Sequence, residues 1–212
     1  MTTAGELQDR IASPSLLRQG TFFLTGALAG AASLPVEGAF LSLTNRLDYT
    51  TGLKHIRSSA PAVLARTGIR FWTFDHIRNY SSSTLHLPVT LSGALGGAAG
   101  GLNEVLLHSL AFTRRLPSPR AALSQSGKLF LCFGSYTYIS TSLSQELPPK
   151  PFWKCWLMGA TAGCFGSAVT VAFEGARNKA LVVASARGAL VIGTVISVQV
   201  TSCAASLKGL GV

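Results

Sequence analysis

The sequence contains few charged residues and very few acids. Only 12% of its 212 residues are charged, and 8 Asp and Glu stand against 18 Lys and Arg. A soluble domain has about 25% charged residues. The 48% of hydrophobic residues exclude a disordered chain, and the composition is not that of an ordinary cytosolic enzyme. A mean hydropathy of +0.38 with a formal charge of +10 favours an integral membrane protein with basic loops.

The usual signatures of catalysis and of metal binding are also missing. The sequence has four cysteines, at Cys132, Cys155, Cys164 and Cys203. None has C-x-x-C spacing, so we expect neither a disulfide framework nor a metal site. Without a phosphate loop, a nucleophile elbow or a metal constellation, we expect no catalytic residues, no cofactor and no enzyme. The bases are spread over loops with little aromatic interleaving, which argues against nucleic acid as a partner.

Six segments compete as membrane spans, each of which needs about 20 mostly apolar residues. They cover residues 20–43, 60–74, 88–112, 128–143, 152–173 and 180–205. The third, fifth and sixth are the clearest. The first contains Pro35 and Glu37, the second contains Arg66 and Arg70, and the fourth is short and rich in hydroxyl groups. We expect six spans, with four as the alternative.

The basic residues concentrate in the odd-numbered loops, which join spans 1–2, 3–4 and 5–6. Eleven of the 18 are assigned to these loops: Arg46, Lys54, Arg57, Arg66, Arg114, Arg115, Arg120, Lys128, Arg177, Lys179 and Arg187. Short basic loops stay on the side from which insertion is driven. We therefore expect both termini on the opposite side, and anionic lipid head groups at the odd loops. The first 18 residues lack the apolar region of a signal peptide.

One pattern occurs three times along the chain. Gly-Ala-x-x-Gly opens a stretch at Gly26, at Gly93 and at Gly159, at intervals of 67 and 66 residues. Each stretch then runs through an apolar helix to a basic exit. Glycines four residues apart let a neighbouring helix approach closely, so the predicted packing positions are Gly26, Gly30, Gly93, Gly97, Gly159 and Gly163. We predict one all-α transmembrane domain over residues 1–212. Three two-helix repeats (20–80, 88–143 and 152–206) would place six helices around a pseudo-threefold axis.

Each repeat also carries one acid in its odd helix. Glu37 and Glu104 lie 11 residues after the opening glycine, and Glu174 lies 15 after it, one helical turn further along the same face. A charge in hydrocarbon is costly. The acids therefore line a central cavity together with Arg70, or neighbouring Ser, Thr and Arg side chains satisfy them; the sequence leaves both open. Glu174 can also pair with Arg177 at i,i+3.

These features resemble the mitochondrial carrier family over residues 20–206, as a short and degenerate member. The odd helices of that family end in Pro-x-[Asp/Glu]-x-x-[Lys/Arg]. Residues 172–177 keep the acid and the base, residues 35–40 keep the proline and the acid, and residues 102–107 keep only the acid. Its even helices end in [Phe/Tyr]-[Asp/Glu]-x-x-[Lys/Arg], which Phe74, Asp75 and Arg78 match in full.

The resemblance implies a mitochondrial inner-membrane protein with its odd loops in the matrix and cardiolipin bound at those loops. It also implies a central cavity for a small anionic metabolite. The cavity candidates are Glu37, Arg70, Glu104 and Glu174, and the gate salt-bridge candidates are Asp75, Arg78, Glu174 and Arg177.

Much of the family's gate network is missing from this sequence, which leaves a second interpretation. The chain would then be a non-transporting structural, assembly or import-type subunit of a large membrane complex. A second resemblance agrees with this alternative. It is to the Gly-rich, four-span group that includes translocase channel subunits and a respiratory complex I accessory subunit.

Overall fold

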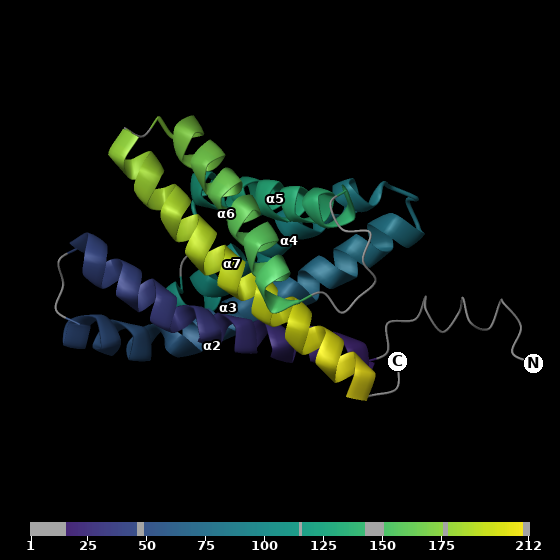
Figure 1. The fold of residues 1–212 in the computed structure, drawn as a ribbon, viewed down its shortest axis with the longest axis horizontal. Coiled ribbons are helices and arrows are strands. Elements are labelled where there is room, and N and C mark those ends of the chain that lie inside the picture. The colour runs from purple at the N-terminus through teal and green to yellow at the C-terminus, as the bar shows by residue number, and fades with distance from the viewer. Residues whose placement is uncertain (1–15, 46–48, 115, 143–150, 176–177, 210–212) are drawn as a thin grey trace, which may run out of the picture.

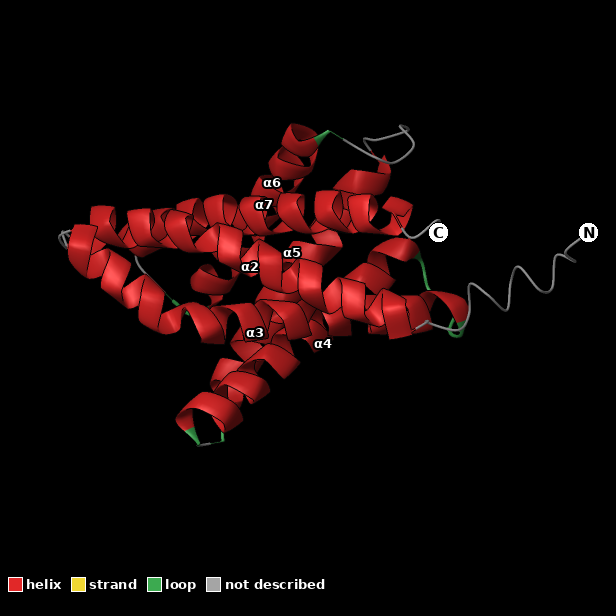
Figure 2. Cartoon of the chain, turned by 90° about the horizontal axis from the view of Figure 1, so that it is seen from below, coloured by secondary structure: helices red, strands yellow, loops and turns green. Residues whose placement is uncertain are grey.

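The described part of the chain is entirely helical. The computed structural model describes residues 16–45, 49–114, 116–142, 151–175 and 178–209. Its long helices are α2 (Leu16–Asn45), α3 (Tyr49–Ser83), α4 (Val89–His108), α5 (Pro119–Ser142), α6 (Phe152–Phe173) and α7 (Asn178–Gly209). A π-helical turn, Ser109–Thr113, extends α4. The prediction of six helices without strands is confirmed for these residues (Figures 1 and 2).

The six helices form a closed ring. Each helix packs against the next one along the chain, and α7 also packs against α2. Contacts are most extensive within the hairpins α2–α3, α4–α5 and α6–α7. In Figure 1 the C-terminal end of α2 lies at the left beside the start of α3, and the C-terminal end of α6 lies at the upper left beside the start of α7. The start of α2 and the end of α7 lie at the right in both views. We call the end of the ring where α2 meets α3 and α6 meets α7 the odd-loop end. The opposite end, where α2 begins and α7 ends, is the even-loop end.

The predicted glycine pairs lie in the contact faces of the hairpins. A Cβ atom on Gly26 would lie 2.9 Å from the Thr67 carbonyl oxygen of α3, and one on Gly97 would lie 2.8 Å from Cβ of Phe133 in α5. In the third hairpin, a Cβ on Gly163 would lie 2.6 Å from Cβ of Ile192. Real Cβ atoms essentially never come this close. Each hairpin therefore requires glycine, which has no side chain, at these positions.

α4 carries glycines on two faces because it packs closely against two neighbours. Gly93, Gly97 and Gly101 face α5, whereas Gly96 and Gly100 face α3. A Cβ on Gly100 would lie 2.8 Å from the Arg70 carbonyl oxygen, and one on Gly101 would lie 2.9 Å from that of Gln125. The glycine-rich centre of α4 thus brings the backbones of α3 and α5 close to the same turn.

Three helices in the described ranges are long and apolar enough to cross a membrane. They are Gln19–Phe40, Phe152–Phe173 and Lys179–Ser206, with mean hydropathies of 1.2, 1.4 and 2.0. This corrects the expected ranking of the spans, in which residues 88–112 stood among the clearest and residues 20–43 did not. α4 is not among the three, because its glycines contribute little hydropathy. The first segment is among them, and α2 runs through Pro35 without interruption.

The helices also extend beyond the expected spans, which corrects the assignment of several bases to loops. α3 begins at Tyr49 and α5 at Pro119, whereas the spans were expected to begin at residues 60 and 128. Lys54, Arg57 and Arg120, which were assigned to odd loops, therefore lie within α3 and α5. Arg66, Lys128 and Arg187 were counted with the same loops although they fall within the expected spans, and they lie inside α3, α5 and α7.

Two glycines on neighbouring helices test whether close packing holds the ring together. Gly97→Ala should destabilise the protein by about 1–3 kcal/mol, because the new methyl group overpacks the α4–α5 contact. Gly127→Ala should stabilise it by about 0.5–1 kcal/mol, because Gly127 is a helical residue in α5 with no neighbour within 4 Å of its Cβ position. Thermal unfolding in one detergent measures both. Shifts of the same sign and size would contradict the packing account.

Candidate functional site

The second helix of each hairpin (α3, α5 and α7) carries a base that belongs to one charged group. Arg70 lies on α3, Lys128 on α5 and Arg187 on α7, at intervals of 58 and 59 residues. These three helices alternate around the ring, with α4 and α6 between them. The charges of Arg70, Arg187 and Glu104 nevertheless all act on the Lys128 ammonium. Arg70 and Lys128 are buried or partly buried between the helices, whereas the Arg187 side chain is half exposed.

Glu104 of α4 is at the centre of this charged group. The Arg70 guanidinium donates two hydrogen bonds to its Oε2 atom, from Nη2 at 2.6 Å and from Nε at 2.8 Å. Gln125 of α5 donates a third bond to the same oxygen at 3.2 Å. The side chains of Glu104 and Arg70 are only 7% and 11% exposed. A buried carboxylate needs such charge-assisted bonds to remain ionised.

Two nearby cations have hydrogen-bonding capacity that the described residues do not use. The Nε atom of Arg66 is buried without a hydrogen-bond partner and lies 4.0 Å from Oε1 of Glu104. Lys128 is partly buried and makes no hydrogen bond or ion pair with the described part of the chain. Ammonium and guanidinium groups in such a position are costly unless an anion or water meets them.

The three predicted acids share one structural role, because each binds across a seam between two hairpins. Glu104 joins α4 to α3 through Arg70, and Glu37 joins α2 to α7 through an ion pair with Arg187 at 2.5 Å. Glu174, just after α6, accepts a 2.6 Å hydrogen bond from the Ser124 hydroxyl of α5. The acid of each hairpin's first helix (α2, α4 or α6) therefore contacts the second helix of the neighbouring hairpin (α7, α3 or α5).

Six of these residues form what we call the charged layer: Glu37, Arg66, Arg70, Glu104, Lys128 and Arg187. The layer has four bases and two acids, so it carries an excess of two positive charges. The Arg187 side chain is 50% exposed and the Arg66 side chain 31%. The buried end of the layer is therefore at Arg70 and Glu104, and its periphery is open.

Beyond the charged layer, toward the even-loop end, the interior is filled by apolar side chains. Phe71 and Phe74 of α3, Phe133 of α5 and Ile192 and Ile196 of α7 form this apolar layer. Phe133 packs edge-on against Phe71 at 5.6 Å between ring centroids and at a tilt against Phe74 at 4.5 Å. On α3, α5 and α7 the bases of the charged layer precede the residues of the apolar layer, so the two layers stack along the ring.

The predicted gate residues differ in burial, and one of them lies outside the described residues. Asp75 is buried on α3, and the Arg78 guanidinium lies 5.9 Å from the centroid of the Phe74 ring on the same helix. Their ion pair stays a prediction. Glu174 is exposed and binds Ser124, whereas its predicted partner, Arg177, lies outside the described residues.

The sequence alone missed Lys128, Arg187 and Gln125 as members of the site. Lys128 and Arg187 were counted with the odd loops, although they fall within the segments expected as the fourth and sixth spans. The near-equal intervals between Arg70, Lys128 and Arg187 (58 and 59 residues) were the signal that could have identified them. Gln125 has no such signal, because its role depends on how closely α5 approaches α4 at Gly101.

Comparison of the chain with protein-family models, curated proteins and solved structures finds no match. The likeness to the carrier family therefore comes from the repeats and the motifs of the sequence.

The Arg70–Glu104 pair can be tested by a double-mutant cycle. Arg70→Met should cost about 3–5 kcal/mol of unfolding free energy, because it leaves the Glu104 carboxylate buried with weaker partners. Glu104→Met should also destabilise, and the double variant should lose clearly less than the sum of the two. Glu174→Gln, at an exposed position, should change stability by no more than about 0.5 kcal/mol. Additive losses in the cycle would contradict the pairing.

Proposed function

We propose that the chain is a six-span, carrier-like membrane protein that passes a small anionic solute through its helix ring. The observation that carries this proposal is the charged layer, with four bases against two acids and with unused donors on Arg66 and Lys128. Partly buried cations with unused hydrogen-bond donors favour a bound anion. An anion at Lys128 would also lie within the field of Arg70 and Arg187.

The proposed path follows from the order of the two layers. An anion would enter from the odd-loop end, where Arg187 is half exposed, and meet the bases at the depth of Arg70. The apolar layer around Phe133 would close the path toward the even-loop end. Transport would then require the apolar layer to separate in a second state, and the solute must bind the two states differently for that to occur.

The membrane arrangement in this proposal has several supports. Three helices have the length and composition of membrane spans. α3, α4 and α5 close the same ring, and each hairpin is built on one glycine pair. The acids bridge the three seams in the same sense around the ring, as a pseudo-threefold repeat would require. Location in the mitochondrial inner membrane, with the odd loops in the matrix, is proposed from the family resemblance.

Reconstitution in liposomes tests the transport proposal. Carboxylates, inorganic phosphate and nucleotides should be screened for uptake alongside neutral and cationic amino acids. We expect uptake of at least one anion class. Lys128→Met should reduce that uptake about tenfold or more, because a hydrogen bond to a charged group contributes about 1.5–3 kcal/mol. Lys128→Arg should retain part of the activity.

Lys179→Met is the matched control, because Lys179 is an exposed base at the start of α7. It should leave uptake within twofold of the wild type. Uptake that is absent for every anion, or that is equal in wild type and Lys128→Met, would contradict the proposal. Stable migration with a large complex in mild detergent, together with absent uptake, would instead favour the non-transporting subunit.

A further inference from the structure

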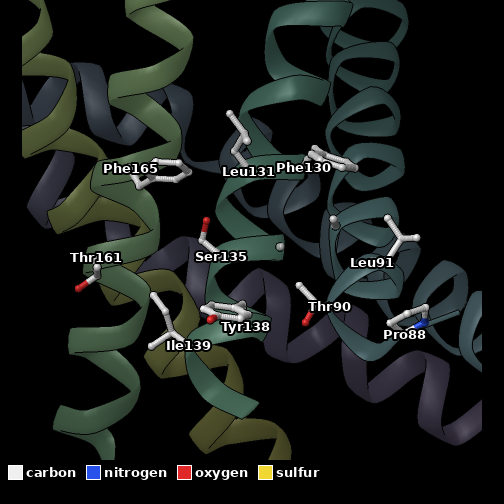
Figure 3. Close-up of a pocket in the computed structure, with 12 residues that line it drawn as sticks. Pro88, Thr90, Leu91, Phe130, Leu131, Ser135, Tyr138, Ile139, Thr161 and Phe165 are labelled. Atoms are coloured by element: carbon white, nitrogen blue, oxygen red, sulfur yellow. The ribbon is translucent and has the colours of Figure 1, made fainter. Parts of the chain in front are cut away.

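A lateral groove lies on the outer face of the ring, over α5 and between α4 and α6. Its volume is about 620 Å³, and its lining is almost wholly apolar. Figure 3 shows Leu91 of α4 on one wall, Ser135 and Ile139 of α5 on the floor, and Phe165 of α6 on the other wall. The side chains of Leu91 and Phe165 are exposed, so the groove opens sideways, away from the charged layer.

The position of the groove along α6 gives its depth in a membrane. Thr161 and Phe165 lie nine and thirteen residues after Phe152, the first residue of a candidate span. At 1.5 Å per residue these positions are about 14–20 Å from the start of the helix, which is the middle of a hydrocarbon core of about 30 Å. An occupant at this depth must therefore come from the apolar part of the bilayer.

The length of the groove matches a single leaflet. Its floor runs along α5 from Phe130 to Ile139, a rise of about 14 Å and about half of the hydrocarbon thickness. One end of the groove is at Pro88, the cap of α4, and so is close to the even-loop end of the ring. The other end is near mid-membrane. A chain that enters from the even-loop surface and stops at the bilayer centre fits this geometry.

The even-loop end of the same α6 face carries a cation at the level of the head groups. Lys154 lies seven residues before Thr161, on the same side of the helix. Its ammonium lies 5.6 Å from the ring centroid of the exposed Trp153. A tryptophan with a lysine at the start of a span is typical of the membrane interface, where phosphate groups lie.

We propose that this groove binds a phospholipid of the leaflet on the even-loop side, with one acyl chain along α5 and its phosphate at Lys154. The inference depends on the membrane arrangement proposed above but does not depend on transport. It places an ordered lipid at the α5–α6 seam and at the opposite end of the ring from the basic odd loops.

Native mass spectrometry of the full chain in mild detergent tests the lipid site, with dioleoylphosphatidylglycerol as the probe. The wild type should retain one tightly bound lipid. Ser135→Trp, which fills the floor, should bind it about tenfold more weakly or not at all. Thr161→Trp should do the same from the α6 wall, and circular dichroism checks that both variants fold. Lys154→Met should weaken binding about fivefold, as expected for the loss of one basic residue at the lipid surface.

Leu28→Trp is the control, because Leu28 is an exposed residue of α2, away from the groove. It should bind the lipid as the wild type does. Equal retention by the wild type and by both groove-filling variants would overturn the proposal, as would unchanged affinity in Lys154→Met. This measurement is made in detergent and does not involve transport. A failure of lipid binding can therefore be told apart from a failure of transport.

Discussion

The buried carboxylate of Glu104 is the interaction on which the ring depends most. An isolated carboxylate in a low-dielectric interior is very costly, and here three donor groups from α3 and α5 meet one of its oxygens. Those donors reach it because Gly100 admits the α3 backbone at Arg70 and Gly101 admits the α5 backbone at Gln125, one turn earlier on α4. Close packing and charge pairing thus meet at the same turn of α4.

The same arrangement places charge and apolar bulk in separate layers. α3, α5 and α7 each carry charged-layer bases on the odd-loop side of their apolar-layer residues. Ion pairs hold the charged layer together, and aromatic and aliphatic packing holds the apolar layer together. Among the described residues the bases of the charged layer outnumber its acids, and Lys128 makes no hydrogen bond or ion pair with them. An interior of this kind favours anions by electrostatics before any specific contact is made.

Much of this architecture could be predicted from the sequence, because repetition and the small side chain of glycine leave direct signals. Gly26, Gly97 and Gly163 were identified by spacing and lie in helix contacts, and Glu104 was identified as an intramembrane acid. The partners of the acids could not be predicted. Glu37 binds Arg187, which lies 150 residues away and beside it only because α7 closes on α2. Hydropathy also misplaced the ends of α3 and α5, because a ring with a charged interior tolerates polar residues in its helices.

The central claim is that all six helices cross the membrane as one ring, and the most direct measurement is the sidedness of two loop positions. Leu116→Cys and Phe173→Cys place exposed thiols (82% and 88% exposed before substitution) after α4 and at the end of α6. In intact vesicles, a membrane-impermeant maleimide should label both from one side, and Leu85→Cys from the other side. Six crossings require this result, because both positions lie at the odd-loop end. Two alternatives have fewer crossings: in one only α2, α6 and α7 cross the membrane, and in the other only α2, α4, α6 and α7 do. In both, residues 116 and 173 would be labelled from opposite sides, and the six-span account would be wrong.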